Sequence, residues 1–382
     1  MKLAVLTETA AGETRVSVVP DGVRTLGNLG FEVAVQSGAG ERAFFADAAY
    51  EKAGATITTT ATEALSGASV VVRVRPPSPA EAKQLPERCV LVATLDALRN
   101  ADLLAQLAIG GVSAIAMELI PRITRAQSMD VLSSQATAAG YRAVLIAAAA
   151  APRFFPMLMT AAGTIAPAKV LVLGAGVAGL QAIATARRLG AVVSAFDIRP
   201  AVKEQVESLG ATFVGFQVSG AETAGGYAKE VSEAERQREH EHLAGLVRDA
   251  DVVITTAQVP GRPAPRLITA DMVEAMKPGA VIVDMAAESG GNVELTRAGE
   301  EVVANGVRIF GPVNLAAGLQ THASQMYSRN ITTLLTHMVK DREIRVDLAD
   351  EIVGSACVTH DGQVRATDGR PPIPIATAPQ PA

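Results

Sequence analysis

The chain contains little of what metal centres, disulfide scaffolds and base-stacking surfaces require. Among its 382 residues are only two cysteines, Cys89 and Cys357, and no tryptophan, and aromatic residues make up 3% of the sequence. Two cysteines cannot build a disulfide framework or a cysteine-based metal site, so we expect no metal centre and a reducing compartment such as the cytosol. The shortage of aromatic side chains leaves few surfaces on which nucleic-acid bases could stack.

The chain also lacks a basic excess and a long apolar run. Its formal net charge is −5 and it has no long basic segment, which argues against nucleic-acid binding. The first residues, MKLAVLTE, lack the apolar core and cleavage site of a signal peptide. The most apolar run, 143–152, is shorter than the roughly 20 residues that span a bilayer. We therefore expect no direct membrane insertion, and any membrane association has to go through a partner.

Histidine is missing from the first 239 residues, and the chain has only His240, His242, His322, His337 and His360. An ordinary dehydrogenase that oxidises an alcohol or an amine moves a proton as well as a hydride, usually through His, Lys or a carboxylate. His240 and His242 lie in a charged segment, where we expect them to be exposed to solvent. The first domain is therefore expected to offer no histidine for proton transfer.

What the chain does contain is a strand–turn–helix–strand pattern over 168–199, AKVLVLGAGVAGLQAIATARRLGAVVSAFDIR. An apolar strand leads into three glycines, and a helix rich in Ala and Leu follows them and ends at Gly190. Gly174 allows the tight turn, Gly176 lets a pyrophosphate approach the backbone, and Gly179 lets the helix pack closely. The helix N-terminus then presents its N–H groups and the positive end of its dipole to the phosphates.

Asp197 ends the second strand of this pattern, 18 residues after Gly179. A carboxylate at this place accepts hydrogen bonds from both ribose hydroxyls of an adenosine and repels a 2′-phosphate, which favours NAD over NADP. Arg199 keeps the other possibility open, because a nearby arginine accommodates that phosphate. The pattern predicts a dinucleotide site; the alternative is a glycine-rich turn in some other α/β domain.

Apolar strand-like runs alternate with helical segments along the whole chain. This alternation predicts an α/β fold with two doubly wound parallel-sheet, Rossmann-like domains separated by a cleft. The Ala-rich residues 136–151 are expected to form one long helix that joins the domains. Strands are expected at 2–7, 31–36, 56–58, 69–74, 89–93 and 112–116, and again at 169–173, 191–196, 212–215, 251–255, 280–284 and 308–310.

The first domain is expected to be discontinuous. It ends near residue 132 without a covering element, and the amphipathic helix expected at 324–339 needs a surface to pack against. We therefore expect the C-terminal segment to return to it. The expected domains are 1–132 plus 317–382, and 133–316.

Polar side chains are concentrated between two apolar stretches at 122–135. One interpretation is a solvated loop that opens a helix. The other is a polar clamp on a nicotinamide carboxamide, in which an arginine donates to the carboxamide oxygen and an aspartate accepts from its NH2. The spacing alone leaves both open, because loops have both roles. The polar residues are Arg122, Arg125, Gln127, Asp130, Ser133 and Gln135.

The stretch PRITRAQSMDVLSSQATAAGYRAV at 121–144 resembles the NAD(H)-binding domain I of proton-translocating transhydrogenase. So do MTAAGTIAPAKVLVLGAGVAGLQAIATARRLGAVV at 159–193, ETAGGYAKE at 222–230 and TTAQVPGRPAPRLIT at 255–269. The resemblance covers nearly the whole chain. It implies that Arg122, Gln127 and Asp130 form the loop that places the dihydronicotinamide, with Ser133 beside it. Gln127 would reach toward the second nucleotide.

The resemblance also implies contacts to the rest of NAD(H) and a loop that closes on it. These are Val177 and Gly179 at the pyrophosphate, Asp197, Ile198 and Arg199 at the adenosine ribose, Gly226 and Tyr227 at the tip of the mobile loop, and Gln258 on the adenine side, where the family often has an apolar residue.

The activity that the resemblance implies explains the missing histidines. In this family a hydride passes directly between two nicotinamides, so the site needs no acid or base and acts by positioning. NADP(H) would bind a separate beta subunit, and a further subunit would span the membrane and translocate protons. The chain would form a homodimer and lie in the cytoplasm, at the inner face of the cytoplasmic membrane, held there by these partners.

Two other functions stay open. Alanine dehydrogenase resembles this fold closely, but that family uses a histidine and a lysine in its first domain. Residues 71–75 read VVRVR and 91–98 read LVATLDAL, and neither the lysine nor the histidine is evident there. The third possibility is an NAD-sensing module, which would bind NAD without a productive partner.

Overall fold

The computed structural model describes residues 1–215, 233–259 and 261–365, and only the backbone at 233–239. The chain forms two compact units, Met1–Gln135 with Ala317–Ala382 (unit 1) and Ala136–Ala316 (unit 2). Unit 1 is built from both ends of the chain, as the discontinuous first domain expected from the sequence would be. Helix α6 (Val131–Ala150) carries the chain from unit 1 into unit 2.

Unit 1 contains an eight-stranded sheet of order β19-β18-β6-β5-β4-β1-β2-β3. The pairs among β1 to β6 are all parallel, which confirms the expected doubly wound parallel sheet. The C-terminal segment adds β18 to β6 and β19 to β18, both antiparallel. The strands are β1 (Lys2–Val5), β2 (Glu32–Gln36), β3 (Thr56–Thr58), β4 (Val70–Val72), β5 (Val90–Ala93), β6 (Ser113–Ala116), β18 (Cys357–His360) and β19 (Gln363–Val364).

Side chains of these strands alternate between two hydrophobic cores, one on each face of the sheet. In β1, Leu3 and Val5 enter the first core and Ala4 enters the second. Because helices cover both faces, the strands can be apolar throughout. The first face packs against α1 (Pro20–Asn28), α2 (Asp47–Lys52), α11 (Gln320–Met338) and α12 (Glu351–Ala356), and the second against α3 (Ala61–Leu65), α4 (Pro79–Ala82) and α5 (Ala101–Ile109).

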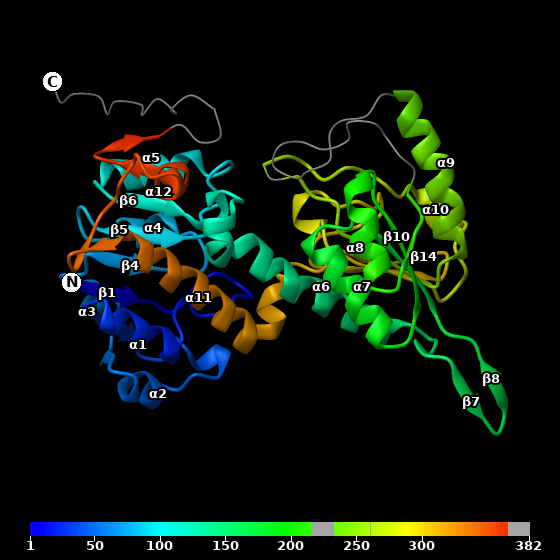
Figure 1. Cartoon of the computed structure of the whole chain (residues 1–382), viewed down its shortest axis with the longest axis horizontal. Coiled ribbons are helices and arrows are strands. Elements are labelled where there is room, and N and C mark those ends of the chain that lie inside the picture. Colours follow the sequence, from blue (N-terminus) through cyan, green and yellow to red (C-terminus); the bar gives the residue numbers. More distant parts are fainter. Residues whose placement is uncertain (216–232, 260, 366–382) are drawn as a thin grey trace. The chain divides into compact units, whose positions relative to one another are not determined.

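Helix α11 is the longest element of the C-terminal segment in unit 1. It lies against α1 although the two come from opposite ends of the chain (Figure 1). Tyr327, Ile331 and Leu334 of α11 are at most 1% exposed and belong to the first core. The amphipathic helix expected near the C-terminus therefore does cover the first domain, as its apolar side required.

Unit 2 contains a seven-stranded sheet of order β11-β10-β9-β12-β13-β15-β14. All pairs are parallel except β14 with β15. The sequence order of the strands reverses between β9 and β12, the place where open α/β sheets bind ligands at the carboxyl ends of the strands. The strands are β9 (Lys169–Leu173), β10 (Val192–Phe196), β11 (Thr212–Phe213), β12 (Val252–Thr255), β13 (Val281–Asp284), β14 (Glu301–Ala304) and β15 (Val307–Phe310).

Helices cover both faces of this sheet as well. One core takes residues of α6 and of two helices that follow β9 and β10, and the other takes residues of two helices beside β12 and β13. These four helices are α7 (Val177–Arg188), α8 (Lys203–Ser208), α9 (Glu233–Asp249) and α10 (Ala270–Glu274).

The structure also contains short elements that the sequence patterns do not predict. Residues 152–167 include a hairpin, β7 (Leu158–Thr160) and β8 (Gly163–Ile165), which projects from unit 2 in Figure 1. A second hairpin, β16 (Val339–Lys340) and β17 (Glu343–Ile344), follows α11. The strands of these two hairpins are too short to show a period in the sequence.

No helix in the described part of the chain is long and apolar enough to cross a bilayer.

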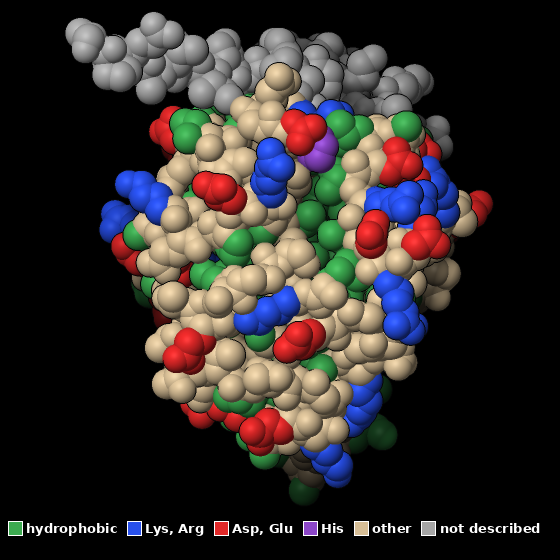
Figure 2. Space-filling model, turned by 90° about the vertical axis from the view of Figure 1, so that its left-hand side faces the viewer, with side chains coloured by type: hydrophobic (Ala, Val, Ile, Leu, Met, Phe, Trp, Pro, Cys, Tyr) green, Lys and Arg blue, Asp and Glu red, His purple; other side chains and the backbone are tan. Residues whose placement is uncertain are grey.

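The face of the molecule in Figure 2 carries Lys and Arg interspersed with Asp and Glu. On that face neither sign of charge forms a broad patch.

Candidate nucleotide-binding site

The glycine turn after β9 has the geometry that the sequence predicts. Gly174 adopts a φ of +97°, in the left-handed region that side chains disfavour. At Gly179 an added Cβ would lie 1.9 Å from the carbonyl oxygen of Gly174, so the first turn of α7 can close on the loop only without a side chain. At Gly176 an added Cβ would meet no atom of the described residues within 4 Å. As far as these residues show, the space in front of Gly176 is open, as a close approach by phosphate requires.

The backbone donors at the N-terminus of α7 have no side-chain cap among the residues that the structure describes. Gly176 is the N-cap residue, and no side-chain hydrogen bond caps this end within the described residues. Val177 is 39% exposed. Arg187 and Arg188 lie in the last turn, where positive charge complements the helix dipole. The free N–H groups and the positive end of the dipole form a site for an anion.

Asp197 follows β10 and is held by four hydrogen bonds. Its Oδ2 accepts from the backbone N of Ala175 at 2.7 Å and from Arg199 Nη2 at 2.8 Å. Its Oδ1 accepts from the backbone N and from Nε of Arg199, both at 2.9 Å. The carboxylate is 6% exposed and the Arg199 side chain is 14% exposed. Arg199 therefore pairs with Asp197, and ribose hydroxyls would have to replace its guanidinium group.

The remaining residues expected around NAD(H) are found as follows. Ile198 packs partly buried against the core on the α9 and α10 side. Gln258 is exposed, and its Nε2 donates to the carbonyl oxygen of Met285 at 2.9 Å. Gly226 and Tyr227 lie outside the described residues. The turn, α7 and Asp197 all lie at the carboxyl ends of β9 and β10 within unit 2.

The loop expected to place the nicotinamide belongs to unit 1. It forms a short 3-10 helix, η3 (Thr124–Met129), which leads directly into α6. Asp130 accepts from the backbone N of Ser133 at 2.9 Å and from its Oγ at 2.6 Å, so it caps the first turn of α6. Arg122 and Gln127 are exposed. Asp130 and Ser133 are thus in contact, and Gln127 points outward from the same loop.

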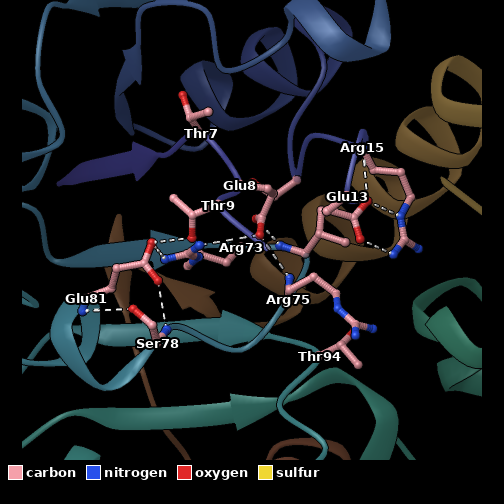
Figure 3. A network of polar contacts seen from close by, with 12 residues as sticks. Thr7, Glu8, Thr9, Glu13, Arg15, Arg73, Arg75, Ser78, Glu81 and Thr94 are labelled. Carbon is pink, nitrogen blue, oxygen red and sulfur yellow. Dashed lines mark hydrogen bonds and ion pairs between the residues drawn. The ribbon is translucent and has the colours of Figure 1, made fainter. Parts of the chain in front are cut away.

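A buried polar cluster lies at the carboxyl ends of β1 and β4, which are neighbours where the strand order of the unit 1 sheet reverses (Figure 3). The Arg73 side chain is 1% exposed and pairs with Glu81 Oε1 at 2.7 Å and with Glu8 Oε2 at 3.5 Å. Glu8 also accepts from the backbone N of Val74 at 2.6 Å. Burial raises the pKa of Glu8 against the opposing effect of Arg73.

A second ion pair lies in the same cluster. Arg15 donates through Nε to Glu13 Oε1 at 2.8 Å and through Nη2 to Oε2 at 2.6 Å. Its Nη1 donates to Gln135 Oε1 at 2.8 Å. In the sequence, Glu8, Glu13 and Arg15 stand out only as members of one loop. Glu13 and Arg15 pair with each other inside this loop. The contact of Glu8 with Arg73 and that of Arg15 with Gln135 cannot be found from the sequence, because these partners come from distant elements.

The polar groups that follow β4 and β5 are Arg73, Arg75 and Thr94, and Figure 3 shows Arg75 extending toward Thr94. Within the described residues of this cluster there is neither a lysine nor a histidine.

The expectation that the first domain has no histidine is wrong, because the C-terminal return brings three into unit 1. They are His322, exposed on α11, His337, beside Asp350 at 3.0 Å, and His360, beside Ser113 at 2.9 Å.

Comparisons with known proteins show the family to which the chain belongs. Residues 4–139 match the family model for the alanine dehydrogenase/PNT N-terminal domain, and 143–367 match that for the C-terminal domain. The chain is 50% identical to the first part of NAD(P) transhydrogenase subunit alpha of Rhodospirillum rubrum, covering 95% of this chain and 97% of that protein. It is 30% identical to alanine dehydrogenase of Halomonas elongata, covering 95% and 94%. The crystal structure of transhydrogenase from Sinorhizobium meliloti matches with a TM-score of 0.83 and 45% identity, covering 95% and 98%.

Proposed function

The chain belongs to the alanine dehydrogenase/PNT family, among its transhydrogenase alpha subunits, and from that premise we propose that it is the NAD(H)-binding subunit of a proton-translocating transhydrogenase. In this role NADH bound to the chain gives its hydride to NADP+ held by a partner subunit, and the transfer is coupled to proton translocation. The observation that carries the proposal is the polar cluster at the carboxyl ends of β1 and β4. Its described residues include no lysine or histidine that could move a proton.

The carboxylates of that cluster are poor substitutes for such a base. Glu8 is 1% exposed and Glu13 is 0% exposed. Both are paired with guanidinium groups, and Glu8 accepts from a backbone amide as well. A general base has to reach the proton that it removes. Hydride transfer between two nicotinamides requires no such group, so the cluster and the proposed reaction are compatible.

Unit 2 has the features that hold NAD(H). In the part of the chain that the structure describes, the open space at Gly176 and the uncapped N-terminus of α7 fit a pyrophosphate. The carboxylate of Asp197 fits the ribose hydroxyls once Arg199 moves aside. NAD(H), when bound, supplies the hydride. The residues of the chain bind it and orient it, and the loop with Arg122, Gln127, Asp130 and Ser133 orients the nicotinamide.

The partners in the proposal are a beta subunit that binds NADP(H) and a subunit that spans the membrane. The name of the relative from Rhodospirillum rubrum describes it as one piece of an alpha subunit, which supports a protein divided over several chains. We place this chain at the inner face of the cytoplasmic membrane, attached through these partners, and as a homodimer.

The absorbance of NADH tests the proposal against its main rival. Purified protein that has been shown to bind NADH is given NAD and L-alanine, and then other amino acids, at alkaline pH. We expect no NADH to form. Steady formation of NADH would show an amino-acid dehydrogenase and contradict the proposal. An NAD-sensing module would also form no NADH in this assay. Unlike a transhydrogenase subunit, it would transfer no hydride after an NADP(H)-binding partner is added.

A further inference from the structure

The loop that carries Gln127 and Asp130 has little internal support. It is a 3-10 helix of six residues, in which only Ala126 and Met129 are buried. The hydrogen bonds of a 3-10 helix have poorer geometry than those of an α-helix, and 3-10 helices longer than about four residues are uncommon. A loop of this kind needs contacts from outside to keep one geometry. Besides the packing of Ala126 and Met129 into the first core, the described residues include two polar contacts from the C-terminal return.

The first contact is a buried amide on α11. The Nδ2 of Asn330 donates to the backbone carbonyl oxygen of Ser128 at 2.8 Å. Its Oδ1 accepts from the Oγ of Ser134 at 2.7 Å. Asn330 is 6% exposed, so both polar ends of the amide depend on these two partners. One side chain therefore links the backbone of Ser128, before Asp130, to the side chain of Ser134, after Ser133.

The second contact is an ion pair on the outside of the loop. Arg125 Nη1 lies 3.2 Å from Asp350 Oδ2, and its Nη2 lies 3.1 Å from Glu351 Oε2. Asp350 is fixed in turn, because it caps α12 through the backbone N of Ile352 and of Val353. Desolvation raises the pKa of Asp350, but hydrogen bonds from the backbone N of Val353, from His337 and from Arg125 outweigh it and hold the pKa well below its usual range.

We propose that Asn330 is a positioning residue for hydride transfer, with Arg125 as a second support on the outside of the same loop. The inference rests on the proposed function, in which this loop orients the nicotinamide. Asn330 acts through the backbone of Ser128 and touches neither nucleotide itself. When two reacting groups must be held at near-attack distance, a displacement of about 1 Å in the supporting structure costs up to about 100-fold in rate.

The test uses the full chain together with its NADP(H)-binding partner subunit. Asn330→Asp keeps the shape and the acceptor for Ser134 but sets an oxygen against the carbonyl of Ser128. We expect hydride transfer to NADP+ to slow about tenfold. The dissociation constant of NADH should change by less than about twofold, because the phosphate and ribose contacts lie in unit 2.

Thr332→Val is the matched control on the same helix. Thr332 is also 6% exposed, and its Oγ1 donates to the carbonyl oxygen of Arg329 within α11 at 3.1 Å. This variant loses a buried hydroxyl that does not touch the loop, and its rate should stay within about twofold of the unaltered protein.

Arg125→Gln is a second variant. It does not disturb the packing of the core, because the Arg125 side chain is 48% exposed. We expect a decrease of about threefold in transfer rate, and little change when Arg24→Gln breaks the exposed pair with Asp21.

Two results would overturn the inference. One is transfer at the unaltered rate by both Asn330→Asp and Arg125→Gln. The other is an equal loss of NADH binding and of transfer, which indicates a general structural defect. If Asn330→Asp does not fold, the transfer rate of Arg125→Gln alone tests the inference. Failure of the unaltered protein to transfer hydride to a competent partner would instead overturn the proposed function, and the inference with it.

Discussion

At the scale of single residues, the structure shows roles that the types of the residues do not reveal. The sequence pattern predicts that Asp197 meets a ribose, but Arg199 occupies both of its oxygens. For Asp130 the sequence leaves open a simple loop or a clamp, and in the structure it caps α6 through Ser133. The cap does not exclude a role at the nicotinamide, because a carboxylate has more acceptor positions than these two bonds use.

The Asp197–Arg199 pair leads to opposite predictions for its two members. Asp197→Ala should weaken NADH binding about tenfold or more, because hydrogen bonds to a charged group contribute about 1.5–3 kcal/mol. Arg199→Ala should leave NADH binding equal or tighter, since no guanidinium then competes with the ribose. Titration of NADH by calorimetry measures both. If both variants weakened NADH binding equally, Arg199 would be a ligand of the nucleotide. That result would contradict the prediction that its guanidinium group competes with the ribose for Asp197.

Gln127 offers a test of positioning without a change in the fold, because it is exposed on η3. Gln127→Ala should slow hydride transfer to the partner-bound NADP+ about tenfold or more while NADH binds nearly as before. Single-turnover rates and NADH dissociation constants separate the two effects. Loss of affinity in the same proportion as the rate would show that Gln127 only helps to bind NADH.

At the scale of elements, the turn between β9 and α7 combines a constraint of the fold with an opening for a ligand. Gly179 is required by the chain itself, because a Cβ would collide with the carbonyl of Gly174. Gly176 is not required in this way, since a Cβ there would meet no atom of the described chain within 4 Å and its φ is −77°. The two glycines of one motif should therefore respond differently to the same change.

Gly179→Ala should destabilise the protein by about 1–3 kcal/mol or more, because the backbone of the turn has to shift. Gly176→Ala should leave the free energy of unfolding nearly unchanged and still impair NADH binding, because the new methyl group enters the space for the pyrophosphate. Thermal unfolding and NADH titration of both variants provide the comparison. A stable Gly176→Ala protein with unaltered NADH affinity would mean that phosphate does not approach this turn.

At the scale of the whole molecule, the repeated alternation of strand and helix predicts both parallel sheets, since each covered face needs a helix between strands. The return of the C-terminus is predictable because α11 has an apolar side that has to be covered. Contacts between distant residues are not predictable. Asn330 lies 202 residues from Ser128, and no local pattern connects the two. The pairing of Arg199 with Asp197 depends on side-chain geometry, which the order of residues does not determine.

In the proposed reaction, a hydride passes directly from NADH on this chain to NADP+ on a partner. The most direct measurement uses NADH that carries deuterium at the transferred position of C4, in ordinary water, with this chain and its NADP(H)-binding partner. The mass of the product is then determined. The account predicts NADPH that retains the deuterium, because no proton exchanges with water during the transfer. NADPH without the label, or no NADPH although both nucleotides are bound, would contradict the account.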